Sequence, residues 1–267
     1  ALVVDALRVV LLSGDVGRME HPGTELASLA CDLLDWDFSD DFHRPSYASG
    51  TRRGVLLKPP KIWSQILPPE FASALFAALA SLPPGGRPAH ALRQLCAQLA
   101  AVRGTTYPED ARRRTAHVLC DGCLAMFGRA ARSPTTDTAE ALDAGALLHR
   151  LVSNYGWDGL RGAPSFAPLL HAASRCAARA LETEHDACAA PDWDPDDDDG
   201  GTGALADALL EGLVLLADDA QTEEDRRSLA GAARGLYASH VRCAVRVAAE
   251  EERRAALGAD GDVDEVA

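Results

Sequence analysis

This chain of 267 residues carries a formal net charge of −14 and is 47% hydrophobic but only 5% aromatic. Such a length and apolar content are enough for a sizeable core in about one or two domains. The acidic balance argues against nucleic-acid binding, which needs a basic surface that displaces phosphate counterions, and no apolar run approaches the ~20 residues that span a bilayer.

The chain opens at Ala1 directly in an apolar helical pattern, ALVVDALRVVLL, without the basic flank of a signal peptide. We therefore expect residues 1–267 to be one segment of a longer protein. Seven cysteines, an odd number, lie within helical patterns and do not frame loops. This usage is typical of reduced thiols in the nucleus or cytoplasm.

Apolar residues recur at helical spacing along most of the chain and predict nine helices. Their faces lie over residues 3–10, 26–33, 71–82, 92–102, 120–127, 148–155, 166–181, 205–216 and 229–247. Gly14, the run Pro83 to Gly86 and Pro134 are the expected breaks. No segment shows sustained alternation of apolar and polar residues, so we expect essentially no sheet.

The second predicted helix leads into the longest irregular stretch. Thr24 stands where its hydroxyl can accept hydrogen bonds from backbone N–H groups of the first turn. The predicted apolar face comprises Leu26, Leu29, Ala30 and Leu33. Trp36 extends this apolar surface, and an irregular loop is expected over residues 39–55. Apolar residues become frequent again after the loop, up to Trp63.

Two helices in every ~35–45 residues are typical of α-solenoid repeats. The predicted fold class is therefore all-α, an α-solenoid of HEAT-like antiparallel helix pairs spanning residues 1–267. Because each pair buries its face against its neighbours, a segment of such a stack should have exposed apolar ends. Two acidic tracts, residues 191–203 and the tail 258–267, are predicted to be disordered because they cannot bury enough apolar surface.

Several polar side chains are of the types that bind metals. His117, Cys120 and Cys123 form an H-x-x-C-x-x-C pattern, but a second ligand pair is missing and both cysteines share a face with apolar residues. We interpret them as core thiols and expect no metal or cofactor. The looser trio is read in the same way; it comprises Cys176, His185 and Cys188. The acidic run 192–199 fits a calcium loop only in part.

A catalytic reading has little support. The chain has no phosphate-binding loop, dinucleotide fingerprint or nucleophile elbow. Ser153, His149 and Asp158 are close in sequence, but a triad is defined by geometry. Three consecutive arginines, Arg112 to Arg114, form a basic cluster at a helix start. It is either a solvated face or a contact for acidic cargo or an acidic part of the same chain.

Four segments resemble nuclear export receptors of the importin-β (karyopherin-β) superfamily. They are Leu-Leu-Asp-Trp-Asp-Phe at 33–38, Leu-Leu-Lys-Pro-Pro-x-x-Trp at 56–63, LRQLCAQLAAVRGTTYPED at 92–110 and LLHRLVSNYGWDGL at 147–160. Their order and spacing, more than any one motif, carry the resemblance.

The resemblance implies a curved receptor that binds protein cargo together with GTP-bound Ran. It would pass the nuclear pore by weak contacts with Phe-Gly nucleoporins, shuttle between nucleus and cytoplasm, and leave GTP hydrolysis to Ran, so the chain itself would not be an enzyme. Two alternatives stay open: a HEAT-type scaffold without Ran dependence, and an all-α enzyme, which would need a pocket with convergent polar groups.

Overall fold

The computed structural model describes residues 2–15, 18–34, 63–102, 106–132, 138–188 and 222–261. Within these ranges the chain is helical and contains no β-strand, which confirms the all-α prediction. The elements are α1 (Leu2–Ser13), η1 (Met19–Gly23), α3 (Thr24–Leu34), α4 (Trp63–Ile66), α5 (Pro69–Ser81), α6 (Arg87–Ala101), α7 (Glu109–Ala130), α8 (Thr138–Leu160), α9 (Phe166–Cys188) and α11 (Glu223–Gly261).

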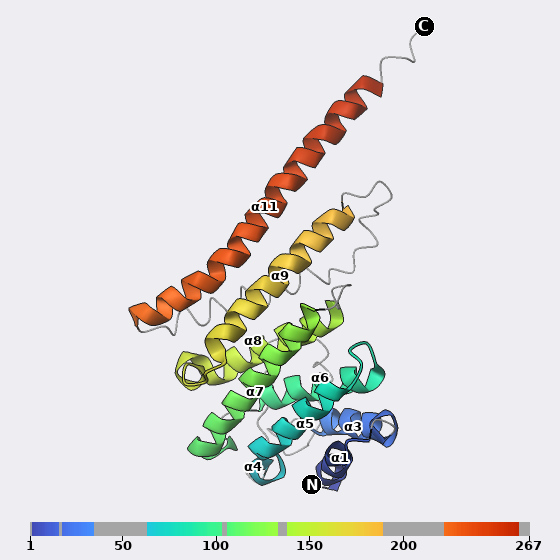
Figure 1. Ribbon diagram of the computed structural model, residues 1–267, viewed down its shortest axis with the longest axis vertical. Helices are drawn as coiled ribbons and strands as arrows, with labels where there is room; N and C mark the ends of the chain where they lie inside the picture. Colours follow the sequence, from blue (N-terminus) through green and yellow to red (C-terminus); the bar gives the residue numbers. More distant parts are fainter. Residues whose placement is uncertain are drawn as a thin grey trace, which may run out of the picture.

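The helices stack in two layers (Figure 1). The first layer contains α1, α5, α7, α9 and α11, and each of these contacts the next. The second layer contains α3, α6 and α8, again in contact in that order. Across the layers α1 packs on α3, α5 on α6 and α7 on α8. Stacked pairs of helices close in sequence are the arrangement of a HEAT-like solenoid, as predicted.

Glycine and proline set several of the helix ends. Gly14 follows α1 with φ +63°, a left-handed conformation that costs glycine little. Pro69 opens α5, Pro88 lies in the first turn of α6, and Pro108 precedes α7. Proline is tolerated at these places because the first N–H groups of a helix have no partner within the helix. The breaks expected at Gly14 and at Pro83 to Gly86 are confirmed.

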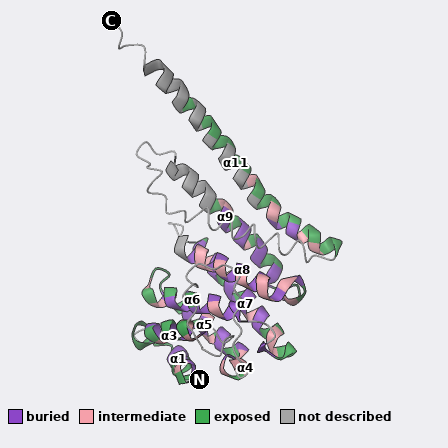
Figure 2. Ribbon diagram, turned by 180° about the vertical axis from the view of Figure 1, so that it is seen from behind, coloured by how far each residue is buried: buried purple, intermediate pink, exposed green. Residues whose placement is uncertain are grey.

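The core lies between the two layers and continues along the stack (Figure 2). Leucine and phenylalanine side chains from both layers fill it; the largest fully buried ones include Phe71, Leu75, Leu92, Leu95, Leu119, Phe127 and Leu147. Each pair of helices therefore depends on its neighbours for part of its buried surface.

The packed face of α3 differs from the prediction. Ala30 is buried as predicted and Leu26 packs against the core, but Ala27 and Leu34 are also buried and the predicted Leu29 is 45% exposed. α3 packs on α6, and two of its three buried apolar residues are alanines. Apolar spacing predicted the helix correctly but placed its buried face about one residue away from the observed one. Two adjacent faces of this helix carry apolar residues, so spacing alone does not distinguish them.

The expected capping role of Thr24 is also wrong. Thr24 already has helical backbone angles, φ −61° and ψ −47°. Its Oγ1 donates a hydrogen bond to the Met19 carbonyl at 3.0 Å and does not accept one from the first turn of α3. The hydroxyl thus closes the η1 turn, which has a non-helical residue at His21 and a cis His21-Pro22 bond.

The C-terminal part of α8 turns sharply at Gly156. This residue has φ +60° and ψ −175°, so α8 consists of a long helix up to Tyr155 and a short last turn after it. The turn places Trp157 edge-on against Phe166 of α9, with ring centroids 5.5 Å apart. Gly156 thereby directs the chain from the second layer back to the first.

Several predictions fall on residues that the structure does not describe. They are Trp36, the 39–55 loop, the acidic tract 191–203 and the helix over 205–216. Trp63 is described and is partly buried at the start of the short helix α4. The last predicted helix is confirmed, and it is longer than expected, since α11 reaches Gly261 and includes the first residues of the tail 258–267.

Two arginines with little exposure tie neighbouring helix pairs together. Arg93 of α6 is 2% exposed; its Nε lies 2.7 Å from Asp143 Oδ2 on α8, and its Nη1 donates to the Pro84 carbonyl at 2.7 Å. Arg129 of α7 donates from both Nε and Nη2 to Oε1 of the fully buried Glu140 on α8. Charge-assisted contacts of this kind fix orientation as well as contact.

A glycine in α7 lies directly against an aromatic side chain of α5. A Cβ at Gly122 would lie 2.3 Å from the Phe76 ring. We expect Gly122→Ala to destabilise the protein by about 1 kcal/mol, because overpacking costs ~1–3 kcal/mol and alanine's higher helix propensity returns only part of that. Gly128 of the same helix has no atom near its virtual Cβ, so Gly128→Ala should stabilise. Thermal unfolding of both variants measures the difference between them. Equal changes in the midpoint temperature would contradict the packing of Phe76 against Gly122.

Candidate interaction surfaces

The predicted arginine cluster lies in the first turns of α7. Arg112 and Arg113 both reach Glu109, with closest N–O distances of 3.8 and 3.5 Å, and Arg114 reaches Glu70 of α5 at 3.6 Å. The carboxylates that face the cluster thus come from the same chain. Exposed ion pairs of this kind contribute about 0–1 kcal/mol to stability. An acidic partner would therefore displace Glu109 and Glu70 from the arginines at little cost in free energy.

The three arginines are not equivalent. The Arg112 guanidinium lies over the ring of Tyr155, 5.7 Å from its centroid. Tyr155 is buried on α8, and desolvation raises the pKa of its hydroxyl above the usual range. Arg112 therefore belongs to the packing between α7 and α8, whereas the side chains of Arg113 and Arg114 are 62% and 63% exposed and are the two that a partner could reach.

The cysteine pattern in α7 is part of the core. Cys120 and Cys123 are both fully buried, as predicted, and Cys123 Sγ donates to the Ala144 carbonyl of α8 at 3.4 Å. Burial raises the pKa of the Cys120 thiol to about 12, so the thiol stays protonated at neutral pH and is a weak nucleophile. Cys176 is buried as well, while the side chains of His185 and Cys188 lie outside the described part of the structure.

The residues Asn154 to Trp157 form a junction between repeats. The Asn154 amide nitrogen donates to the carbonyls of Ala100 and Val102 at 2.9 and 2.6 Å, which closes the C-terminal end of α6. Tyr155 is buried, the chain turns at Gly156, and the Trp157 ring packs against Phe166. This short stretch therefore contacts three helices.

The structure does not assemble a triad from Ser153, His149 and Asp158. The Ser153 hydroxyl donates to the His149 carbonyl of its own helix at 2.8 Å. Asp158 follows the Gly156 turn, is exposed and pairs with Arg161 at 3.5 Å. The Ser153 hydroxyl therefore bonds within its own helix, and Asp158 contributes to the charge of the surface.

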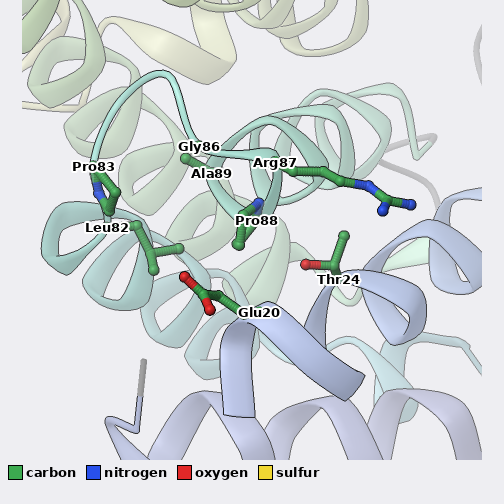
Figure 3. A pocket seen from close by; sticks show the side chains of 8 residues that line it. All are labelled: Glu20, Thr24, Leu82, Pro83, Gly86, Arg87, Pro88 and Ala89. Atoms are coloured by element: carbon green, nitrogen blue, oxygen red, sulfur yellow. The ribbon is translucent and has the colours of Figure 1, made fainter. Parts of the chain in front are cut away.

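One cleft that sequence reasoning missed lies where η1 and α3 meet the α5–α6 connection (Figure 3). Its volume is about 300 Å³, and its lining comprises Glu20, Thr24, Leu82, Pro83, Gly86, Arg87, Pro88 and Ala89. Apolar walls and two charged residues of opposite sign, Glu20 and Arg87, would suit one or two side chains of a peptide. No local pattern could have shown it, since its walls are about sixty residues apart in sequence.

Large exposed apolar side chains gather at the two ends of the stack. Leu2, Val9 and Leu12 project from α1, and the corresponding residues of α11 are Tyr237, Val241 and Val245. Apolar ends were expected of a solenoid segment, and among the described residues they are observed at both outer helices of the first layer.

Comparisons with known proteins give no neighbour. No protein-family model, no curated protein and no solved structure matches this chain. No described helix is long and apolar enough to cross a membrane.

Proposed function

We propose that this chain is part of a nuclear export receptor that binds protein cargo together with GTP-bound Ran. The observation that carries the proposal is the two-layer stack of helix pairs with apolar ends. Small rotations between repeats add up to a wide curved surface, which suits a receptor that encloses large partners.

Two of the four segments that resemble the importin-β superfamily lie largely in described helices of this stack, whereas most residues of 33–38 and 56–63 lie outside the described part of the structure. Residues 92–110 run from α6 into the start of α7, with Tyr107 buried. Residues 147–160 contain the Asn154 to Trp157 junction. A resemblance at such positions supports the same helix arrangement, and the export function follows from it as a proposal; an exportin-4-like receptor is the first candidate and an exportin-7-like receptor is the alternative.

In this proposal the chain catalyses nothing, since GTP hydrolysis belongs to Ran. Arg113 and Arg114 offer a contact for acidic segments of cargo, and the receptor shuttles between nucleus and cytoplasm through contacts with Phe-Gly nucleoporins. The supporting feature for the cargo contact is the exposure of both guanidinium groups beside weak surface ion pairs.

The test is nucleotide-selective binding of Ran. The purified chain is immobilised, and its affinity is measured by biolayer interferometry for Ran loaded with a non-hydrolysable GTP analogue and for Ran loaded with GDP. We expect the GTP form to bind at least about tenfold more tightly, a difference of ~1.4 kcal/mol. Ran bound to importin-β-type receptors of known function is the positive control.

Equal affinity for the two forms, or binding of neither, would reject the export proposal. The two-layer stack would then be a helical scaffold without Ran dependence. An Arg113→Ser/Arg114→Ser variant, measured in parallel with an Arg226→Ser/Arg227→Ser variant on α11, reports whether the α7 arginines contribute to any binding that is seen.

A further inference from the structure

The long helix α11 carries an exposed stripe along one side. It comprises Ala230, Arg234, Tyr237, Val241, Val245 and Ala248, which we call the α11 stripe. Steps of three and four residues place all six on one face of a helix. Tyr237 is 69% exposed and Val245 is 64% exposed, so the apolar part of this face is in contact with solvent over several turns.

The stripe lies opposite the face that packs on α9. Leu229 and Ala232 are the buried residues of α11, and Ser174 Oγ of α9 donates to the Ala232 carbonyl at 2.6 Å. Val241 follows Ala232 by nine residues, which is roughly half a turn away around a helix with 3.6 residues per turn. Figure 2 shows the described buried residues of α11 near the N-terminal end of the helix, in the part that lies beside α9.

The stripe continues an interface that already repeats in the first layer. α5, α7 and α9 are each packed between two neighbours of that layer, whereas α9 is the described helix of that layer on which α11 packs extensively. The surface that α11 presents on its other side is therefore the surface on which a further helix would stack. A helix is the shape that matches it.

Charge decides which helix would fit. From Ser228 to Ala249 the sequence has Arg234, Arg242 and Arg246 and no aspartate or glutamate, in a chain whose net charge is −14. A second copy that laid its own 228–249 stretch along this one would oppose arginine with arginine, and like charges disfavour such an interface. Carboxylates beside the apolar stripe of the incoming helix would instead be attracted to Arg234.

We propose that the α11 stripe is the docking surface for an amphipathic α-helix from outside residues 1–267, with leucine-like side chains along one face and carboxylates flanking them. The apolar face covers Tyr237, Val241 and Val245, and a flanking carboxylate pairs with Arg234. This inference rests on the stacking and charge of α11 and does not depend on Ran binding.

Two synthetic peptides test the proposal on the full chain. Both are fluorescein-labelled helices of about 20 residues with the same leucine stripe; glutamates flank it in one and lysines in the other. By fluorescence polarisation we expect the glutamate peptide to bind about tenfold more tightly at low salt, because complementary charge adds to apolar contact. Arg234→Glu should reverse that preference, and Val241→Asp should remove binding of both peptides.

Val9→Asp is the matched control. Val9 is an exposed valine on α1, at the other end of the same layer, so its replacement should leave both affinities unchanged. Arg234 is exposed, which makes Arg234→Glu informative even if Val241→Asp lowers the thermal stability.

Three results would overturn the proposal. Equal affinity for the two peptides would remove the charge argument. A concentration-dependent dimer in light scattering that Val241→Asp dissociates would make a second copy the occupant. Binding of the glutamate peptide only after Leu209→Asp would mean that the chain's own segment 205–216 covers the stripe.

Discussion

Replacing Arg129 with methionine is expected to lower the free energy of unfolding by about 3–5 kcal/mol. Both Nε and Nη2 of Arg129 donate to Glu140 Oε1, and Glu140 is fully buried. The variant would leave the carboxylate in the core without its arginine, and the desolvation cost of a buried charge would be offset much less. Urea unfolding followed by circular dichroism measures the change.

The double variant Arg129→Met/Glu140→Leu should recover most of that loss, since it removes both charges together. The Leu79 carbonyl, which also accepts from Arg129, keeps a second donor in the Leu82 N–H. Arg227→Met breaks an exposed pair with Glu223 on α11 and should change stability by less than about 1 kcal/mol. A loss in the double variant as large as in Arg129→Met would contradict this account.

Gly156→Ala is expected to cost about 1–3 kcal/mol. The angles φ +60° and ψ −175° belong to a region that side chains with a Cβ almost never occupy. Gly156→Asn should cost as much, because asparagine tolerates the left-handed helical region, where ψ is near +47°, and not this one. Calorimetric unfolding compares both with Gly128→Ala. A stable Gly156→Asn protein would mean that the turn adopts ordinary left-handed angles.

Fluorescence gives a second measurement for Gly156. Trp157 lies against Phe166 only because the chain turns at Gly156. If the alanine variant straightens the helix to avoid the strained angles, Trp157 becomes more exposed and its emission moves to longer wavelength. An unchanged spectrum together with a lower midpoint would mean that the turn persists and the strain is stored there.

Helix positions were predictable because period and breakers are local properties of the sequence. The apolar residues of α5 and α6, and the Pro83 to Gly86 break between them, mark both helices without any tertiary information. The α3 face was predicted only in part: Ala30 is buried as expected, but Ala27 and not Leu29 faces the core. Thr24 was misread because the partner of its hydroxyl depends on the η1 turn.

The surfaces were less predictable than the helices. Arg112 to Arg114 were recognised as a cluster, but only the fold shows that Arg112 packs on Tyr155 and that Glu70 approaches Arg114 from another helix. The cleft between η1 and the α5–α6 connection and the orientation of the α11 stripe depend on how distant segments stack. Spacing in the sequence carries no information about either.

The buried arginines have a consequence for how the molecule would respond to force. Arg93 joins α6 and the α5–α6 connection to α8, and Arg129 joins α7 to α5 and α8. Two neighbouring repeats are thus held by bonds with fixed directions, which resist sliding more than apolar contacts do. A chain pulled from its two ends would release α1 and α11 first, while α5 to α8 would yield together, in one step and at a higher load.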